Sequence, residues 1–203
     1  MKKCTLNMII TLSVFICILL LITIKNAINN EDIKNILQTI TQYAEILFLI
    51  YILGACVYIT FSIKNDNKEA LANIRKKDFK KLEEDSNSQI KKYIFLRQIL
   101  NSKYNLLISL LVEGKNEKAF ELLKNTKWGI YSNEVCVFKA IYFLYINDIE
   151  NARLLYRKIY KQKNDNVEIL GLLLDLIDNG IKDNKLNKTI YPVVNEICDK
   201  YEK

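Results

Sequence analysis

Two long apolar runs stand near the N-terminus, and each is long enough to cross a bilayer as a helix. Residues 6–24 carry no charge, and residues 43–63 carry one, Glu45, close to the start of the run. A helix that rises ~1.5 Å per residue needs about 20 such residues to cross the hydrocarbon core. Helices of soluble proteins are seldom apolar on every face. The pattern therefore predicts a hairpin of two transmembrane helices, 6–24 and 43–63, joined by residues 25–42.

Two features of these runs have a second interpretation. A cleavable signal peptide also begins with lysines before an apolar core, but Lys25-Asn26-Ala27 carries lysine where the cleavage site needs a small residue. An uncleaved signal anchor is therefore favoured, and cleavage is the alternative. Glu45 is either a functional carboxylate inside the membrane or an interfacial residue that reaches the headgroups. Its place at the end of the run favours the interface.

Lysine and arginine are distributed unevenly around the two runs. Residues 1–5 contain two lysines, residues 25–42 contain two lysines and two acids, and residues 64–81 contain seven cations and three acids. Short flanking segments rich in Lys and Arg stay on the cytoplasmic side. We therefore expect a multi-pass protein of the cell membrane, with an external loop at 25–42 and both termini, 1–5 and 64–203, cytoplasmic.

The cations after the second run predict a contact with lipid. Residues 64–85 have the spacing of a weakly amphipathic, basic juxtamembrane helix. Cations close to a membrane surface are attracted to anionic headgroups by roughly 1 kcal/mol each. The bilayer is therefore an expected partner, and the residues expected at its surface are Lys64, Lys68, Arg75, Lys76 and Lys77.

The remaining residues, 86–203, are predicted to form an α-helical domain, so the fold class is all-α. Asp85-Ser86-Asn87-Ser88 is the expected break before this domain. Two stretches inside it, EGKNEKAFELL and INDIENARLLY, align with Ala119 and Ala152 33 residues apart. A period of this length is typical of stacked helix pairs. The helices expected from the apolar spacing are 104–113, 116–124, 135–146, 149–161, 167–177 and 190–201.

The aligned stretches resemble tetratricopeptide repeats. A small residue opens the second helix of each pair, and a large apolar residue follows four positions later, as in Ala119 with Leu123 and Ala152 with Tyr156. Gly114 matches the preferred turn residue, whereas the terminal proline is absent and the period is one residue short. The resemblance covers about residues 100–165. It implies a concave groove that binds a protein partner, lined by Tyr104, Ile108, Leu111, Val137, Ile141, Leu144 and Tyr145. The alternative is that these residues are core.

The composition gives no support for catalysis, and we expect no catalytic, cofactor-binding or metal-binding residues. The chain has no histidine, which removes the commonest general base and metal ligand. Its five cysteines form no CxxC pair, and it has neither a phosphate-binding glycine loop nor a G-x-S-x-G motif. Much of the net charge of +7 lies at 64–81, without a nucleic-acid-binding motif. We therefore expect no nucleic-acid partner.

These observations favour a membrane-anchored scaffold or adaptor that recruits an unidentified cytoplasmic protein through a helix-pair domain. The alternative is a small accessory or regulatory subunit of a membrane transport or secretion complex, in which the transmembrane hairpin is the active part. The two differ in whether the soluble domain or the spans carry the function.

Overall fold

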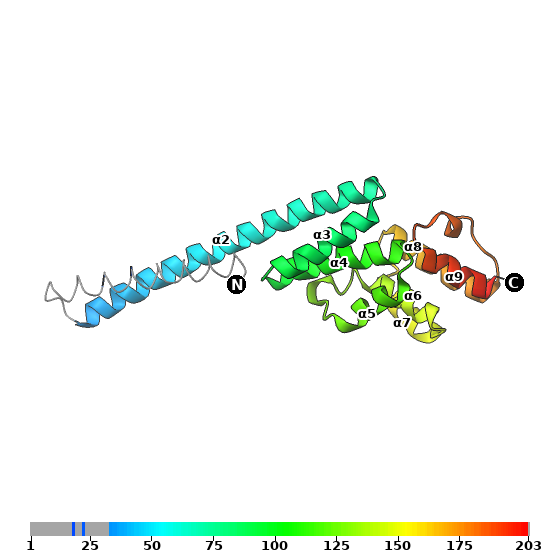
Figure 1. The fold of residues 1–203 in the computed structure, drawn as a ribbon. Helices are drawn as coiled ribbons and strands as arrows, with labels where there is room; N and C mark the ends of the chain where they lie inside the picture. The colour runs from blue at the N-terminus through cyan, green and yellow to red at the C-terminus, as the bar shows by residue number, and fades with distance from the viewer. Residues whose placement is uncertain (1–17, 19–21, 23–32, 203) are drawn as a thin grey trace. The chain divides into compact units, whose positions relative to one another are not determined.

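The computed structural model describes Ile18, Ile22 and residues 33–202. Within these residues the regular elements are eight α-helices and two short 3-10 helices (Figure 1), so the predicted all-α class is confirmed. The α-helices are α2 (Ile33–Arg75), α3 (Phe79–Lys92), α4 (Leu96–Val112), α5 (Asn116–Asn125), α6 (Cys136–Tyr145), α7 (Ile149–Ile159), α8 (Asp165–Asn179) and α9 (Pro192–Tyr201). The 3-10 helices are η1 (Gly129–Tyr131) and η2 (Leu186–Lys188).

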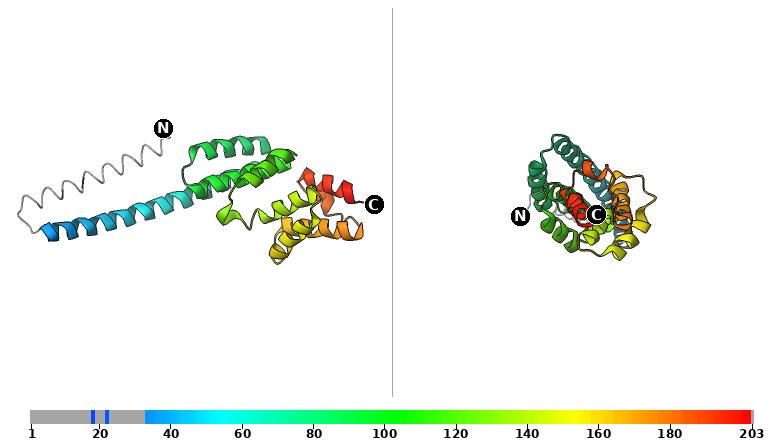
Figure 2. Two further views of the ribbon diagram at one scale, coloured as in Figure 1. Left: turned by 90° about the horizontal axis from the view of Figure 1, so that it is seen from below. Right: turned by 90° about the vertical axis from the view of Figure 1, so that its right-hand side faces the viewer.

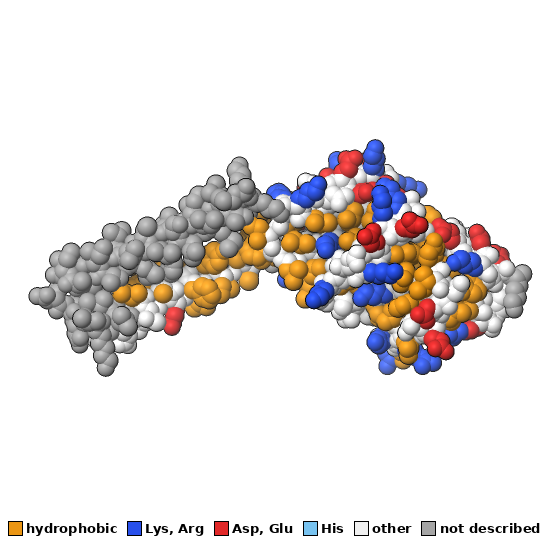
Figure 3. All heavy atoms as spheres, turned by 60° about the horizontal axis from the view of Figure 1, so that its bottom comes forward, with side chains coloured by type: hydrophobic (Ala, Val, Ile, Leu, Met, Phe, Trp, Pro, Cys, Tyr) orange, Lys and Arg blue, Asp and Glu red, His pale blue; other side chains and the backbone are white. Residues whose placement is uncertain are grey.

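Helix α2 contains the second predicted span. Among the described residues it is the one helix that is long and apolar enough to cross a membrane, over Gln38–Arg75, by length and composition. None of its most apolar 18-residue window is buried, and Figure 3 shows apolar side chains along its visible surface. The predicted first span, 6–24, lies outside the described residues except for Ile18 and Ile22. The structure therefore shows one candidate span and does not show the hairpin.

The helix does not stop where the predicted span ends. α2 continues through residues 64–75, and the chain turns at Lys76-Lys77-Asp78 before α3 begins. Lys77 has a φ of 55°. Its N–H donates to the carbonyl of Ile74 (3.0 Å), and the N–H of Asp78 donates to that of Asn73 (2.9 Å). These two bonds form a Schellman motif, in which a left-handed residue satisfies the last carbonyls of a helix.

The same turn follows α4 and α6. Gly114 (φ 69°) and Asn147 (φ 65°) are the left-handed residues. In each turn the carbonyls three and four positions before the left-handed residue accept the two hydrogen bonds. In all three turns the next helix begins two residues after the left-handed residue. The residue five positions after it is buried in every case, namely Leu82, Ala119 and Ala152. The end of α2 and α3 therefore form a helix pair that precedes the two pairs expected from the sequence.

The break predicted at residues 85–88 is wrong. α3 runs through it without interruption, although Asp, Ser and Asn have low helix propensity. Asp85 accepts a hydrogen bond from Nδ2 of Asn73 on α2 (3.1 Å), and Ser86 is buried with 1% exposure. Tertiary contacts thus hold these residues in the helix. The predicted juxtamembrane helix 64–85 is instead the end of α2, a turn and the first half of α3.

Helices α4 to α9 share one apolar core, formed by buried residues from each of them. Ala119, Ala140 and Ala152 are completely buried, because small side chains let neighbouring helices approach closely. α8 and α9 form the last pair at the C-terminal end of the domain (Figure 2). α8 ends at Gly180, which has a φ of 71°. α9 starts directly at Pro192, which lacks the N–H that a first turn does not need.

The turn between α2 and α3 gives a test of the helix pair. A left-handed conformation costs a residue with a Cβ roughly 1–2 kcal/mol, and glycine avoids this cost. We expect Lys77→Gly to stabilise the domain by roughly 1 kcal/mol. The matched control is Lys76→Gly, whose φ is not positive and which we expect to destabilise the domain. Denaturant unfolding of the full chain in detergent, followed by fluorescence of its one tryptophan, the buried Trp128, measures both. Equal effects of the two variants would contradict the assigned turn.

Candidate interaction surfaces

The residues predicted to line a groove are divided between the core and its edge. Leu111, Val137, Ile141 and Leu144 are all less than 5% exposed and belong to the apolar core. Tyr104, Ile108 and Tyr145 are partly buried and pack against that core. In this fold the first four side chains are therefore not accessible to a partner.

Helix α9 packs beside the predicted groove residues of α4 and α6. Pro192 lies against Gly114, Nδ2 of Asn116 donates to Glu196 (2.8 Å), and Nζ of Lys200 donates to the carbonyl of Tyr145 (2.8 Å). The ring of Tyr191, just before α9, meets the edge of Phe138 with 5.8 Å between the centroids. Four residues of α9 join the same buried cluster as the predicted groove residues, namely Val193, Val194, Ile197 and Cys198. The chain's own last helix thus completes the core beside α6.

An open surface remains between α3, α4 and α5. A hollow of about 350 Å³ lies there. Apolar side chains contribute Leu106, Leu110 and Leu122, and the polar and charged lining consists of Glu83, Asn87, Lys103, Lys118, Glu121, Asn125 and Thr126. The sequence does not predict this site, because it does not identify α3 as part of a helix pair. The lining contains two acids and two lysines, which suits a ligand that has apolar groups and charges of both signs.

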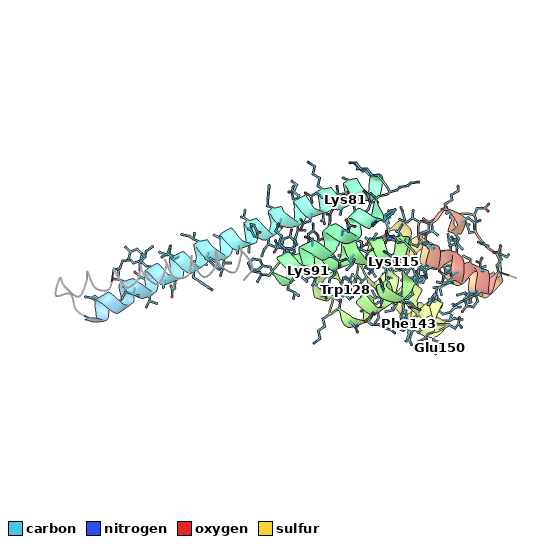
Figure 4. All side chains as sticks on the ribbon, in the orientation of Figure 1. Lys81, Lys91, Lys115, Trp128, Phe143 and Glu150 are labelled. Atoms are coloured by element: carbon cyan, nitrogen blue, oxygen red, sulfur yellow. The ribbon has the colours of Figure 1, made fainter. Side chains whose placement is uncertain are left out.

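A charged cluster holds one side of the hollow together. Nζ of Lys115, labelled in Figure 4, lies 2.6 Å from Oε2 of Glu83 and 2.7 Å from Oε2 of Glu113. The hydrogen bond from Lys115 lowers the pKa of Glu83. The hydrogen bonds to Glu113 and Glu83 raise the pKa of Lys115 to about 12. Glu83 and Lys115 are therefore both ionised at neutral pH, and their ion pair joins α3 to the turn between α4 and α5.

The cations predicted at the membrane surface lie at very different distances from the apolar run. Lys64 follows Ile63 directly, and Lys68 lies roughly 6 Å beyond Lys64 along the helix axis. Arg75 lies roughly 18 Å beyond Ile63, and Lys76 and Lys77 belong to the turn that follows. Lys64 and Lys68 are therefore the two of these cations that lie nearest to the apolar run along the helix.

The side chains that commonly bind metals are not clustered in the described part of the chain. Within it, no group of three or more His, Cys, Asp or Glu side chains is placed to hold a metal ion. Cys136 and Cys198 are free and buried, and burial raises the pKa of both thiols. Protonated, buried thiols are poor nucleophiles, and these two act as small apolar residues of the core.

Replacing a predicted groove residue tests its place in the core. Leu144→Ala removes a side chain with 0% exposure, and such changes cost roughly 2–5 kcal/mol. The matched control is Ile181→Ala, at a position that is 76% exposed, where a change within about 0.5 kcal/mol is expected. Trp128 fluorescence during denaturant unfolding of the full chain measures both. Unchanged stability of Leu144→Ala would show that Leu144 is not a core residue.

The charged cluster predicts a pH-dependent contribution to stability. Because the folded pKa of Glu83 is lowered, its contribution is present above the unfolded pKa of about 4.5 and is lost as pH falls through the folded value. Glu83→Gln should therefore lower stability by at most about 1 kcal/mol at pH 7 and have no effect in acid. The raised pKa of Lys115 keeps the lysine charged throughout this range. Glu84→Gln, at the neighbouring position, is the control, and a pH-independent difference between wild type and Glu83→Gln would contradict the assignment.

No family model, no curated protein and no solved structure matches the chain.

Proposed function

We propose that the chain is a membrane-anchored protein–protein interaction scaffold, in which α2 lies in the bilayer and the helix pairs hold a cytoplasmic partner. The observation that carries this proposal is the continuity of α2. The apolar stretch of α2 is not buried by any other described part of the structure. The same helix runs on, without an intervening loop, into the first helix pair.

The exposed surface of α2 supports the membrane anchor. Leu53, Val57 and Phe61 are each more than 60% exposed. Fully burying such side chains is worth roughly 1.5–3 kcal/mol each, so a long helix covered by them is poorly soluble in water. A bilayer satisfies this surface, and the helix satisfies its own backbone hydrogen bonds. The surplus of Lys and Arg after residue 63 favours the cytoplasm for the domain.

The helix pairs support the scaffold role. Three consecutive helix pairs share one turn geometry. They resemble the stacked helix pairs of tetratricopeptide repeats, and such arrays commonly bind proteins. Because α9 completes the core at the predicted groove, we place the partner at the hollow between α3, α4 and α5. Leucines beside charges of both signs favour a peptide segment with apolar and charged residues over a uniformly charged polymer.

Site-specific photo-crosslinking in the native membrane tests this role. A photoreactive residue replaces Leu122 in the hollow, and the matched control replaces Ile181, an exposed apolar residue outside the hollow. We expect Leu122 to yield an adduct with one discrete protein and Ile181 to yield none. The experiment is repeated with a variant whose residues 6–24 and 43–63 are replaced by an unrelated transmembrane hairpin.

The exchange of the spans separates the scaffold from the accessory subunit. An adduct at Leu122 that persists after the exchange supports the scaffold, because the domain alone then determines the partner. An adduct that disappears after the exchange favours a membrane complex recognised through the spans, since exposed helix surfaces also pack against other transmembrane helices. Equal adducts at both positions, or none at either, would overturn the proposed docking surface.

A further inference from the structure

The connection between α3 and α4 contacts α2 at Ser62 and Asp66, within about one turn of the helix. Residues 92–98 form a compact unit with the part of α2 that ends at Asp66. The hydroxyl of Tyr93 donates to the carboxylate of Asp66, whose oxygens lie at 2.7 and 2.8 Å, and accepts a hydrogen bond from Ser62 (3.1 Å). Tyr93 and Asp66 are both 7% exposed. Burial raises the pKa of Tyr93 to about 12, so the phenol keeps its proton for this bond.

The level of this contact coincides with the end of the apolar run. Ser62 belongs to the last apolar turn, and Asp66 lies roughly 4.5 Å beyond Ile63 along the helix. The headgroup layer on each side of a bilayer is about 5–7 Å thick. If α2 crosses the membrane, Tyr93 and its sequence neighbours therefore lie at the depth of the headgroups.

The side chains next to Tyr93 have the character of an interfacial segment. Ile94 is 37% exposed and Leu96 is 68% exposed, although both are large and apolar. Lys92 and Arg97, both exposed, flank them. On α2, Phe61 is 69% exposed at the same end of the apolar run. Exposed apolar side chains beside cations are typical of segments that lie in the membrane interface.

We propose that the α3–α4 connection is a second membrane attachment, in which Ile94 and Leu96 enter the boundary between headgroups and acyl chains beside α2. Lys92 and Arg97 then meet anionic headgroups. The occupant of this surface is lipid, because the surface continues the exposed apolar surface of α2 within the same unit and its flanking charges are positive. This inference rests on the proposed membrane anchoring of α2.

Tryptophan quenching in lipid vesicles tests the attachment. The full chain is reconstituted into two sets of vesicles of phosphatidylcholine and phosphatidylglycerol, whose acyl chains carry bromine either near the headgroups or near the chain ends. Single variants add a tryptophan at the connection (Ile94→Trp or Leu96→Trp), in the apolar run (Leu53→Trp) or further along α2 (Leu71→Trp). Leu53, Leu71 and Leu96 are all more than half exposed, so the added rings fit without repacking. The native Trp128, 2% exposed in the domain core, is the internal reference.

We expect bromine near the chain ends to quench the tryptophan added at position 53, which lies roughly 15 Å before Ile63, and bromine near the headgroups to quench those added at 94 and 96. Neither label should quench the tryptophans at 71 and 128. Leu71 is the matched control, because it lies roughly 12 Å beyond Ile63 on the same helix. Quenching at 53 without quenching at 94 or 96 overturns the second attachment and leaves the anchor in place, with a protein as the remaining occupant. Absence of quenching at 53 overturns the anchor itself and the attachment with it. Quenching at 71 as strong as at 96 overturns the specific insertion of the connection.

Discussion

The helical array depends on one backbone conformation, a left-handed residue shortly after the end of α2, α4 and α6. This conformation costs roughly 1–2 kcal/mol for a residue with a Cβ, and it is offset because two carbonyls at the helix end gain hydrogen bonds. It also determines the register of the next helix. Leu82, Ala119 and Ala152 are buried because each stands five positions after such a residue, where the new helix first faces its partner.

The sequence predicts the turns only where the left-handed residue is one that favours this conformation. Gly114 and Asn147 are such residues, and the helix boundaries predicted around them are close to those observed. Lys77 has the same conformation but no such preference, so the sequence does not reveal the first pair. The polar run at 85–88 predicts a break instead. Its residues remain helical because Asn73 and the neighbouring helices provide contacts that local propensity does not contain.

The candidate sites are less predictable than the helices, since periodicity shows which face of a helix is apolar but not what covers that face. Leu144 would have the same spacing in a groove as in a core. It belongs to a buried cluster that includes residues of α9, much later in the chain, and Lys200 of α9 bonds to the carbonyl of the neighbouring Tyr145. The hollow is hidden for the same reason, because its walls come from three helices and its lining has no sequence motif.

Helix α4 makes contacts of two kinds with the rest of the domain. One face joins the apolar core through Leu107 and Leu111. The other meets the first helix pair through hydrogen bonds of Asn101 with Asn67 (3.0 Å) and of Ser102 with Gln89 (3.1 Å). A neutral hydrogen bond contributes about 1 kcal/mol net, whereas a fully buried leucine contributes roughly 1.5–3 kcal/mol.

The first pair also has apolar contacts, since Leu82 is buried and Ile90 packs against the apolar core. The hollow lies across the contact between α3 and α4, with Glu83 and Asn87 on α3 and the remaining lining on α4, α5 and Thr126. A ligand bound there would contact both sides and stabilise the closed arrangement in proportion to its affinity. Binding of a ligand in the hollow would thus be thermodynamically linked to the integrity of the first pair.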